Sequence, residues 1–256
     1  MLLCIDIGNT NITLGLFKEG SLGPRWRLAT NYERMPDEFG IQLLGLFSHH
    51  EINIDQVKAG IIASVVPPLT EKWIQVCRSY LNIDLLSVDG AMNTGIELKV
   101  DEPTEVGADR IVDAVAAFQL YGGPACIVDF GTATTFDAVA ANGDYLGGAI
   151  APGIGISRDA LAQKTAKLPK VDLKPPPSPI GTNTIHAMQS GLLLGYIGLV
   201  EGMVARFRAE LGPEMKVIAT GGLAELIADE TEIIQIVAPW LTLDGLNIIF
   251  QQNQKG

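Results

Sequence analysis

Two aspartates with similar surroundings point to phosphate chemistry. Asp6 follows the apolar run LLCI and Asp129 follows the run ACIV, and each precedes one hydrophobic residue, a glycine, and small hydroxyl or amide residues. A strand that ends in an acid and turns tightly at glycine lets backbone N–H groups and short hydroxyls approach phosphate oxygens, while the acid holds a cation. One such motif by itself is more often a plain turn. Two copies half a chain apart favour a nucleotide site carried by two related lobes.

A third acid lies where a loop becomes a helix. Asp109 stands in the sequence GADR, beside a guanidinium. An acid at a helix start commonly caps the helix, and this pattern alone leaves that interpretation open. As a functional group, Asp109 would be kept ionised by the helix dipole and would therefore be a weak base. Phosphoryl transfer can use a weak base, because its loose transition state needs the attacking hydroxyl to be positioned more than deprotonated.

Composition narrows the classes of function. The 256-residue chain carries a net charge of −11, which argues against nucleic acid or an anionic membrane as a partner, since basic patches hold both. No Gly-x-x-x-x-Gly-Lys-Ser/Thr motif is present, and no Gly-x-Gly-x-x-Gly follows the first predicted strand. A P-loop NTPase and a Rossmann dehydrogenase are therefore disfavoured.

The sequence predicts a cytoplasmic protein. Three widely spaced cysteines, Cys4, Cys77 and Cys126, are expected to be small core residues in a reducing compartment. The N-terminus enters a strand without a basic region or a cleavage site. The longest uncharged apolar run, near Gly191 to Val200, has about 10 residues, whereas a bilayer span needs about 20.

Hydrophobic patterning predicts the element order β-β-β-α-β-α-β-α twice. The first copy has strands at Met1–Asp6, Ile12–Phe17, Arg25–Ala29, Val57–Val65 and Ile83–Val88, with helices from Pro36, Pro67 and Asp109. The second copy has strands at Ala125–Phe130, Thr134–Ala141, Tyr145–Ile150, Met215–Thr220 and Glu232–Val237, with helices at Ile154–Gln163, Leu223–Ala228 and from Leu243. After an interruption it also has a long helix near Thr184–Leu211. This order predicts an α/β protein of two duplicated ribonuclease-H-like (actin-like ATPase) lobes, residues 1–121 and 122–256, with ATP in the cleft between them.

Two further segments leave alternatives open. Residues 164–179 are rich in proline and are expected to form either an extended flap or a linker without function. The long predicted helix carries Gly191, Gly195, Gly198 and Gly202, each of which costs roughly 0.8–1 kcal/mol of helix stability relative to alanine. Such glycines favour close packing against another backbone, either within one subunit or across a homodimer interface.

Four motifs occur in the same order as in a known family. DIGNTN at residues 6–11, GADR at 107–110, DFGTATT at 129–135 and GTNT at 181–184 closely resemble type III pantothenate kinase over nearly the whole chain. The resemblance implies a cytoplasmic enzyme of the acetate-and-sugar-kinase, Hsp70 and actin superfamily. It also implies that ATP phosphorylates the primary hydroxyl of pantothenate in the first step of coenzyme A synthesis.

The resemblance implies a role for each motif residue. The first phosphate loop, which binds ATP, would be Asp6, Ile7, Gly8, Asn9, Thr10, Asn11 and Ile12. Asp6 would be the magnesium partner, Thr132 would also meet ATP, and Asp129 would hold potassium or another monovalent cation such as ammonium. Asp109 would be the catalytic base and a substrate contact, in a pantothenate pocket shaped by Gly107, Ala108 and Arg110. Thr184 would contact substrate near a homodimer interface, and Gly221-Gly222 is similar to the adenosine-side glycines of the superfamily.

The chain departs from the family pattern at two positions. Val100, expected in the substrate pocket, stands where many relatives have tyrosine, and Thr182 replaces a basic residue. These departures concern the shape and affinity of the pocket more than the reaction. Two other functions also stay open: a kinase of the same superfamily for another small alcohol or carboxylate, and a regulatory protein that binds nucleotide without turnover.

Overall fold

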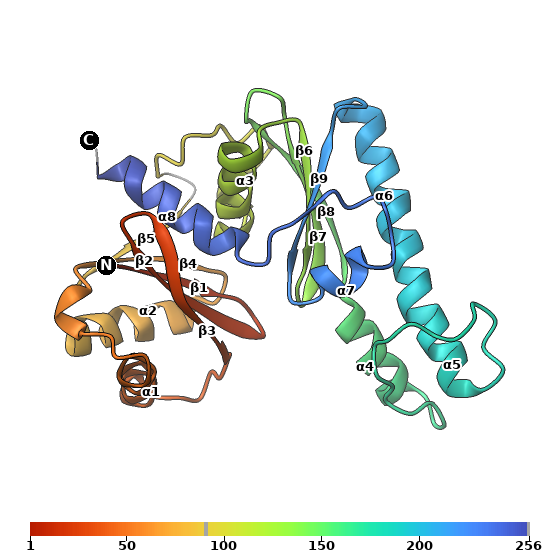
Figure 1. Cartoon of the computed structure of the whole chain (residues 1–256), viewed down its shortest axis with the longest axis horizontal. Coiled ribbons are helices and arrows are strands. Elements are labelled where there is room, and N and C mark those ends of the chain that lie inside the picture. Colours follow the sequence, from red (N-terminus) through yellow and green to blue (C-terminus); the bar gives the residue numbers. More distant parts are fainter. Residues whose placement is uncertain (90–91, 255–256) are drawn as a thin grey trace. The chain divides into compact units, whose positions relative to one another are not determined.

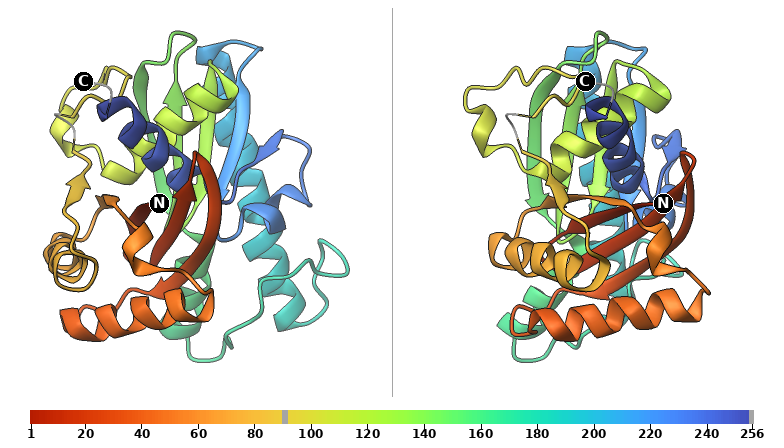
Figure 2. Two further views of the ribbon diagram at one scale, coloured as in Figure 1. Left: turned by 60° about the vertical axis from the view of Figure 1, so that its left-hand side comes forward. Right: turned by 90° about the vertical axis from the view of Figure 1, so that its left-hand side faces the viewer.

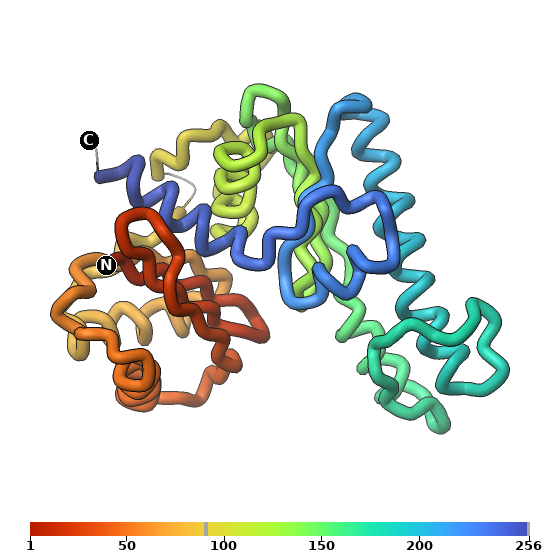
Figure 3. The backbone as a smooth tube through the Cα atoms, viewed as in Figure 1, coloured from red at the N-terminus to blue at the C-terminus, as the bar shows by residue number. Residues whose placement is uncertain are grey.

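The computed structural model describes residues 1–89 and 92–254, which form two compact units (Figure 1). The first unit contains Met1–Gln119 and the segment that starts at Leu241, and the second contains Leu120–Trp240. The predicted division at 121/122 lies two residues after this boundary, and it also places the last helix in the second lobe. The last helix, α8 (Leu241–Asn253), packs on the first unit, because its apolar side covers β1, β2 and β4 of that unit. Figure 3 shows this C-terminal segment, in blue, running beside the red N-terminal strands.

The first unit is built on a five-stranded sheet of order β3-β2-β1-β4-β5. Its strands are β1 (Leu2–Ile7), β2 (Asn11–Lys18), β3 (Ser21–Ala29), β4 (Ala59–Ser64) and β5 (Leu85–Ser87). Its helices are α1 (Pro36–His49), α2 (Pro67–Val76), α3 (Ala108–Tyr121) and α8, with short turns η1 (Ile54–Gln56), η2 (Cys77–Leu81) and η3 (Pro103–Glu105). β2 is antiparallel to β1 and to β3, whereas β4 is parallel to β1 and to β5.

Helices cover both faces of this sheet. α1 and α2 lie on one face and α8 on the other (Figure 2). The alternation of side chains along a strand explains this, because Leu3, Ile5 and Ile7 of β1 join the core under α1 and α2. The intervening Cys4 lies on the other face, near Asp244 of α8. Proline at the first position of α1 and of α2 fixes where each helix begins.

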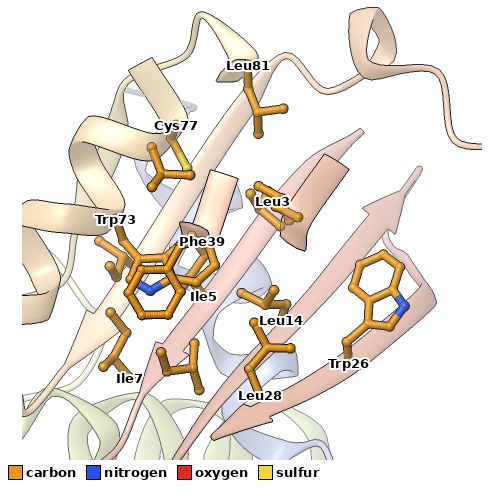
Figure 4. Packing of buried hydrophobic residues seen from close by; sticks show 14 of the residues in the cluster. Leu3, Ile5, Ile7, Leu14, Trp26, Leu28, Phe39, Trp73, Cys77 and Leu81 are labelled. Carbon is orange, nitrogen blue, oxygen red and sulfur yellow. The ribbon is translucent and has the colours of Figure 1, made fainter. Parts of the chain in front are cut away.

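Trp73 of α2 is the largest fully buried side chain and should carry much of the stability of the first unit (Figure 4). Its ring lies 5.3 Å from that of Phe39, and its Nε1 has no hydrogen-bond partner, so packing alone holds it. We expect Trp73→Ala to lower the free energy of unfolding by about 3–5 kcal/mol. Urea denaturation measures this as a lower midpoint at an unchanged m-value. Ile41→Ala, on the exposed side of α1, is the control, and an equal effect of the two substitutions would contradict the prediction.

The second unit repeats the topology of the first. Its strands are β6 (Ala125–Phe130), β7 (Ala133–Val139), β8 (Tyr145–Pro152), β9 (Lys216–Gly221) and β10 (Ile236–Val237), in the order β10-β9-β6-β7-β8. Its helices are α4 (Ile154–Lys164), α5 (Thr184–Gln189), η4 (Ser190–Leu194), α6 (Gly195–Leu211) and α7 (Ala224–Ala228). β6 takes the place of β1, between one antiparallel and one parallel neighbour. The predicted duplicated α/β fold is confirmed, although β10 is shorter than expected because only two residues pair with β9.

α5, η4 and α6 form one continuous helix over Thr184–Leu211, with a π-helical turn at η4. By length and composition alone this helix could cross a membrane, even though its uncharged run is short. A core helix of a soluble protein passes the same test. One side of this helix, including Leu193, Ile197 and Val200, packs on the apolar core of β6, β7 and β9.

The glycines of this helix do not pack against another backbone of the described chain. A Cβ atom added to Gly191, Gly195 or Gly198 would meet no atom within 4 Å, and one added to Gly202 would meet only the Arg206 side chain at 3.3 Å. Packing within one subunit therefore does not explain these residues. The dimer alternative stays a prediction.

The proline-rich segment has no helix or strand between α4 and α5, as expected. It is nevertheless attached to the long helix. Val171 is buried against Met188 and Leu192, and the Ser190 hydroxyl donates to the Pro179 carbonyl at 2.6 Å.

Candidate active site

The first predicted phosphate loop is a tight turn at the carboxyl end of β1. Asp6 is the last but one residue of β1 and pairs with Thr13 of β2 and Ala63 of β4. The Gly8 N–H donates to the Asn11 carbonyl at 2.9 Å, and the Thr30 hydroxyl donates to the Gly8 carbonyl at 2.7 Å. These bonds fix the turn from both sides. The side chains of Asn9, Thr10 and Asn11 are exposed, whereas Ile7 and Ile12 are buried where the two strands join.

The second predicted loop has the same position in the second unit. Asp129 is the last but one residue of β6 and pairs with Thr135 of β7 and Thr220 of β9. Gly131 and Thr132 form the exposed connection between β6 and β7. Each unit therefore presents an acid and a short exposed turn at the end of its central strand, as the repeated motif predicts.

Two residues that were not predicted as site residues form hydrogen bonds to the second loop or beside it. The Gly153 N–H donates to the Thr132 carbonyl at 3.2 Å, so the start of α4 lies directly against the loop. Buried Tyr196 of α6 places its hydroxyl within hydrogen-bond distance of the Thr134 hydroxyl and, at 3.0 Å, of the Pro152 carbonyl. For Gly153, the sequence offers the short glycine-rich turn Gly153-Ile154-Gly155, which does not match a known phosphate-binding motif.

Asp109 occupies the second position of α3 and does not cap it. Ile111 donates to the Gly107 carbonyl at 3.2 Å, which makes Gly107 the residue that precedes the helix. The Asp109 Oδ1 accepts instead from the N–H of the next residue, Arg110, at 2.8 Å. Asp109 is therefore not the N-cap residue, although its carboxylate accepts from one of the first-turn N–H groups, and this bond holds the carboxylate in a defined orientation.

The protonation behaviour of Asp109 also differs from expectation. Burial raises the pKa of this carboxyl above the ordinary value of 3.8, and the Arg110 N–H and guanidinium charge offset this only in part. The helix start was expected to keep the group ionised, but desolvation outweighs the favourable local field. A higher pKa makes Asp109 a better proton acceptor than an ordinary aspartate.

The fold brings the GADR segment beside the carboxyl ends of β1 and β4. A Cβ atom on Gly107 would stand 3.4 Å from Val65 Cγ1 and 2.6 Å from the Asp109 Oδ1. The Val65 N–H in turn donates to the Ile7 carbonyl at 3.1 Å. Ala108 and Arg110 flank Asp109 in the first turn of α3. Within the first unit, Gly107 thus lies between Asp109 and Val65, and Val65 is hydrogen-bonded to the strand that carries Asp6.

The remaining predicted substrate residues lie in two other places. Val100 is in the irregular segment between β5 and η3. Thr184 begins α5, where the Asn183 side chain caps the helix by accepting from the His186 N–H at 2.9 Å. Thr184 is one of the residues that line a cavity of about 670 Å³ within the second unit. The cavity is lined by Leu161, Leu168, Gly181, Thr182, Asn183, Thr184, Ala187, Met188, Gly191 and Leu192.

Comparison with known proteins decides the family. A sequence profile described as type III pantothenate kinase matches residues 2–206. The chain belongs to the type III pantothenate kinase family. It is 53% identical over 255 residues to a type III pantothenate kinase of Roseiflexus castenholzii, and the alignment covers 100% of both chains.

Solved structures at lower identity share the type III pantothenate kinase fold described above. A protein from Campylobacter jejuni, assigned to the Baf family of transcriptional activators, aligns over 99% of this chain and 100% of its own, with a TM-score of 0.63 and 20% identity. A protein from Sinorhizobium meliloti, assigned as a 2-dehydro-3-deoxygalactonokinase, aligns over 99% of both chains with a TM-score of 0.59 and 13% identity. At these identities the likeness concerns the fold alone.

The loop residues have the donor chemistry of a magnesium site. Among the residues described, no group of three or more His, Cys, Asp and Glu side chains gathers as a ready-made metal site. Mg²⁺ in kinases is commonly held by one or two carboxylates together with substrate phosphates. A single carboxylate at each strand end, Asp6 and Asp129, next to an exposed turn, fits that pattern.

Proposed function

We propose the following residue roles for the reaction of this family, in which ATP phosphorylates pantothenate to 4′-phosphopantothenate in coenzyme A biosynthesis. Asp109 accepts the proton of the attacking primary hydroxyl. The observation that carries this role is the Asp109 carboxylate at the start of α3, oriented by the Arg110 N–H at 2.8 Å, and burial, which raises its pKa, supports it. Because the transition state is loose, the main contribution of Asp109 is to hold the hydroxyl in line, with the proton moving late.

The loops bind the nucleotide in this proposal. Asp6 through Ile12 hold phosphate oxygens through the turn after β1, and Thr132 holds ATP from the turn after β6. Asp6 would hold Mg²⁺, and Asp129 would hold potassium or ammonium. When bound, these cations neutralise negative charge that develops on the phosphates. The rigid turns, fixed by Thr30 in the first unit and by Gly153 in the second, support the assignment, because such sites must be organised before the substrate binds.

The acceptor would be held by the segment around Asp109. Gly107, Ala108 and Arg110 shape the pocket, since a guanidinium can bind the pantothenate carboxylate through two parallel hydrogen bonds. Val100 and Thr184 provide further contacts in this proposal.

The protein is proposed to be a cytoplasmic homodimer without nucleic-acid or membrane partners. The open glycine side of the helix Thr184–Leu211 supports the dimer, because small residues permit close approach of a second helix. Its net charge of −11 supports the absence of polyanionic partners.

The reaction is tested by incubating the purified protein with Mg-ATP and pantothenate and separating 4′-phosphopantothenate by chromatography. A panel of other small alcohols and carboxylates distinguishes a different acceptor, and ATP binding without any product would identify a regulatory protein.

The cation role of Asp129 is tested by replacing potassium with sodium at constant ionic strength. We expect turnover to fall sharply, because sodium is smaller and more tightly hydrated than potassium. Ammonium should restore it. An enzyme that works equally well in sodium would contradict the role given to Asp129.

A further inference from the structure

The carboxylate of Asp129 lies against the backbone at the end of β9. β6 and β9 run parallel, so that Asp129 pairs with Thr220 and Phe130 pairs with Gly221. A Cβ atom on Gly221 would stand 2.3 Å from the Asp129 Oδ1. Non-bonded atoms cannot approach so closely. The carboxylate therefore occupies the space that a side chain at position 221 would need.

The backbone of Gly221 strengthens this restriction. Its φ of +90° lies in the left-handed region that residues with side chains seldom adopt. The same Cβ atom would also stand 2.7 Å from the N and C atoms of Phe130. On its other side, the Asp129 Oδ2 is 3.3 Å from where a Cβ atom of Gly131 would lie. Two glycines from two strand ends thus enclose one carboxylate.

We propose that Gly221 is a positioning residue for the cation-binding carboxylate of Asp129, because the missing side chain leaves the space that this carboxylate occupies at the end of β9. The inference rests on the proposed role of Asp129 and adds to it a residue on another strand. Residues that orient a metal ligand commonly change metal affinity by 10- to 100-fold when they are altered. The family resemblance instead places Gly221 on the adenosine side, and that role would change the affinity for ATP.

The experiment compares wild type, Gly221→Ala and Gly212→Ala. Gly212 is in the same unit and also has a positive φ, +96°, but its Cβ would meet nothing within 4 Å, so it controls for backbone strain alone. Two readouts are taken while potassium replaces sodium at constant ionic strength. One is the initial rate of phosphopantothenate formation. The other is the melting temperature of the protein with a saturating non-hydrolysable ATP analogue, which reports potassium binding without turnover.

We expect Gly221→Ala to raise the half-saturating potassium concentration by about 10- to 100-fold in both readouts. Gly212→Ala should lower the melting temperature while leaving the half-saturating concentration near that of wild type. Gly221→Asn provides the same measurement if the alanine variant does not fold, because asparagine tolerates positive φ better and still crowds the carboxylate.

Two results would contradict the proposal, and they differ in which part of it fails. If potassium dependence is unchanged in the Gly221 variants while the KM for ATP rises, the positioning role is wrong and the adenosine-side role is correct. If wild type itself shows no potassium dependence in either readout, the cation role of Asp129 has failed, and the inference fails with it.

Discussion

Asp109→Asn should lower kcat by about 10²- to 10⁴-fold, the range that a positioned general base contributes. The amide keeps the shape of the side chain and can still accept the Arg110 N–H, so acceptor binding and KM should change little. In wild type, the raised pKa predicts that kcat falls on the acid side at a pH above the 3.8 of an ordinary aspartate. Initial rates of phosphopantothenate formation against pH, for both proteins, measure these effects.

The thermal stability of Asp109→Asn provides a second test, because the substitution should lower kcat without lowering the melting temperature. Because the pKa of Asp109 is raised by folding, its ionised form is disfavoured in the native state. The stability contributed by this group is complete below its unfolded pKa and is lost as pH rises through its folded pKa. Asp109→Asn stays neutral, so at neutral pH the variant should unfold at the same temperature as wild type or above it.

Asp37→Asn is the matched control, since Asp37 also occupies the second position of a helix in the first unit. It accepts a hydrogen bond from Tyr80 at 2.7 Å, which asparagine can retain. The control should turn over like wild type. Asp109→Asn with near-wild-type kcat would remove Asp109 from the role of base, and a variant that melts well below wild type would show a structural role instead.

Much of the fold could be predicted, because the patterns that set it are local. β6 was expected at Ala125–Phe130 and occurs there, since an apolar run this short between turns has the length of a strand and is too short for a typical helix. The packing of α8 could not be predicted in the same way. An apolar helix can cover either of two similar sheets, and the choice depends on contacts such as Leu243 against Gly15, which are far apart in sequence.

Some features of the candidate site could likewise be predicted from the sequence, and others could not. The exposed turns after Asp6 and Asp129 follow from their motifs, because glycine and short polar residues dictate a tight turn. The pKa of Asp109 has the opposite shift from the one expected, since desolvation depends on the folded surroundings and the helix dipole was the only effect visible in the sequence. The chain contains 28 glycines, and the sequence does not distinguish Gly153 and Gly221 from the rest. Only the folded structure shows that other atoms occupy the space that side chains at these two positions would need.

Gly153→Ala should reduce kcat/KM for ATP by about 100-fold, because a displacement of roughly 1 Å in a positioned group can cost that much. The new Cβ atom would stand 2.2 Å from the Thr132 carbonyl oxygen and 2.7 Å from that of Gly131. Gly153 has an ordinary φ of −66°, so alanine brings no backbone strain and the whole effect is contact with the loop. Initial rates at varied ATP with saturating pantothenate measure the change.

Gly155→Ala is the matched control, two residues further along and inside α4. Its Cβ atom would meet nothing within 4 Å, and alanine favours a helix over glycine by about 0.8–1 kcal/mol. This variant should therefore keep wild-type kinetics and be slightly more stable. If both alanine variants behave alike, the approach of Gly153 to the second loop does not matter for ATP. If only Gly153→Ala loses ATP affinity while its circular dichroism spectrum and melting temperature stay near wild type, the result supports nucleotide binding by the turn after β6, because the nearest atoms to the new Cβ belong to Gly131 and Thr132.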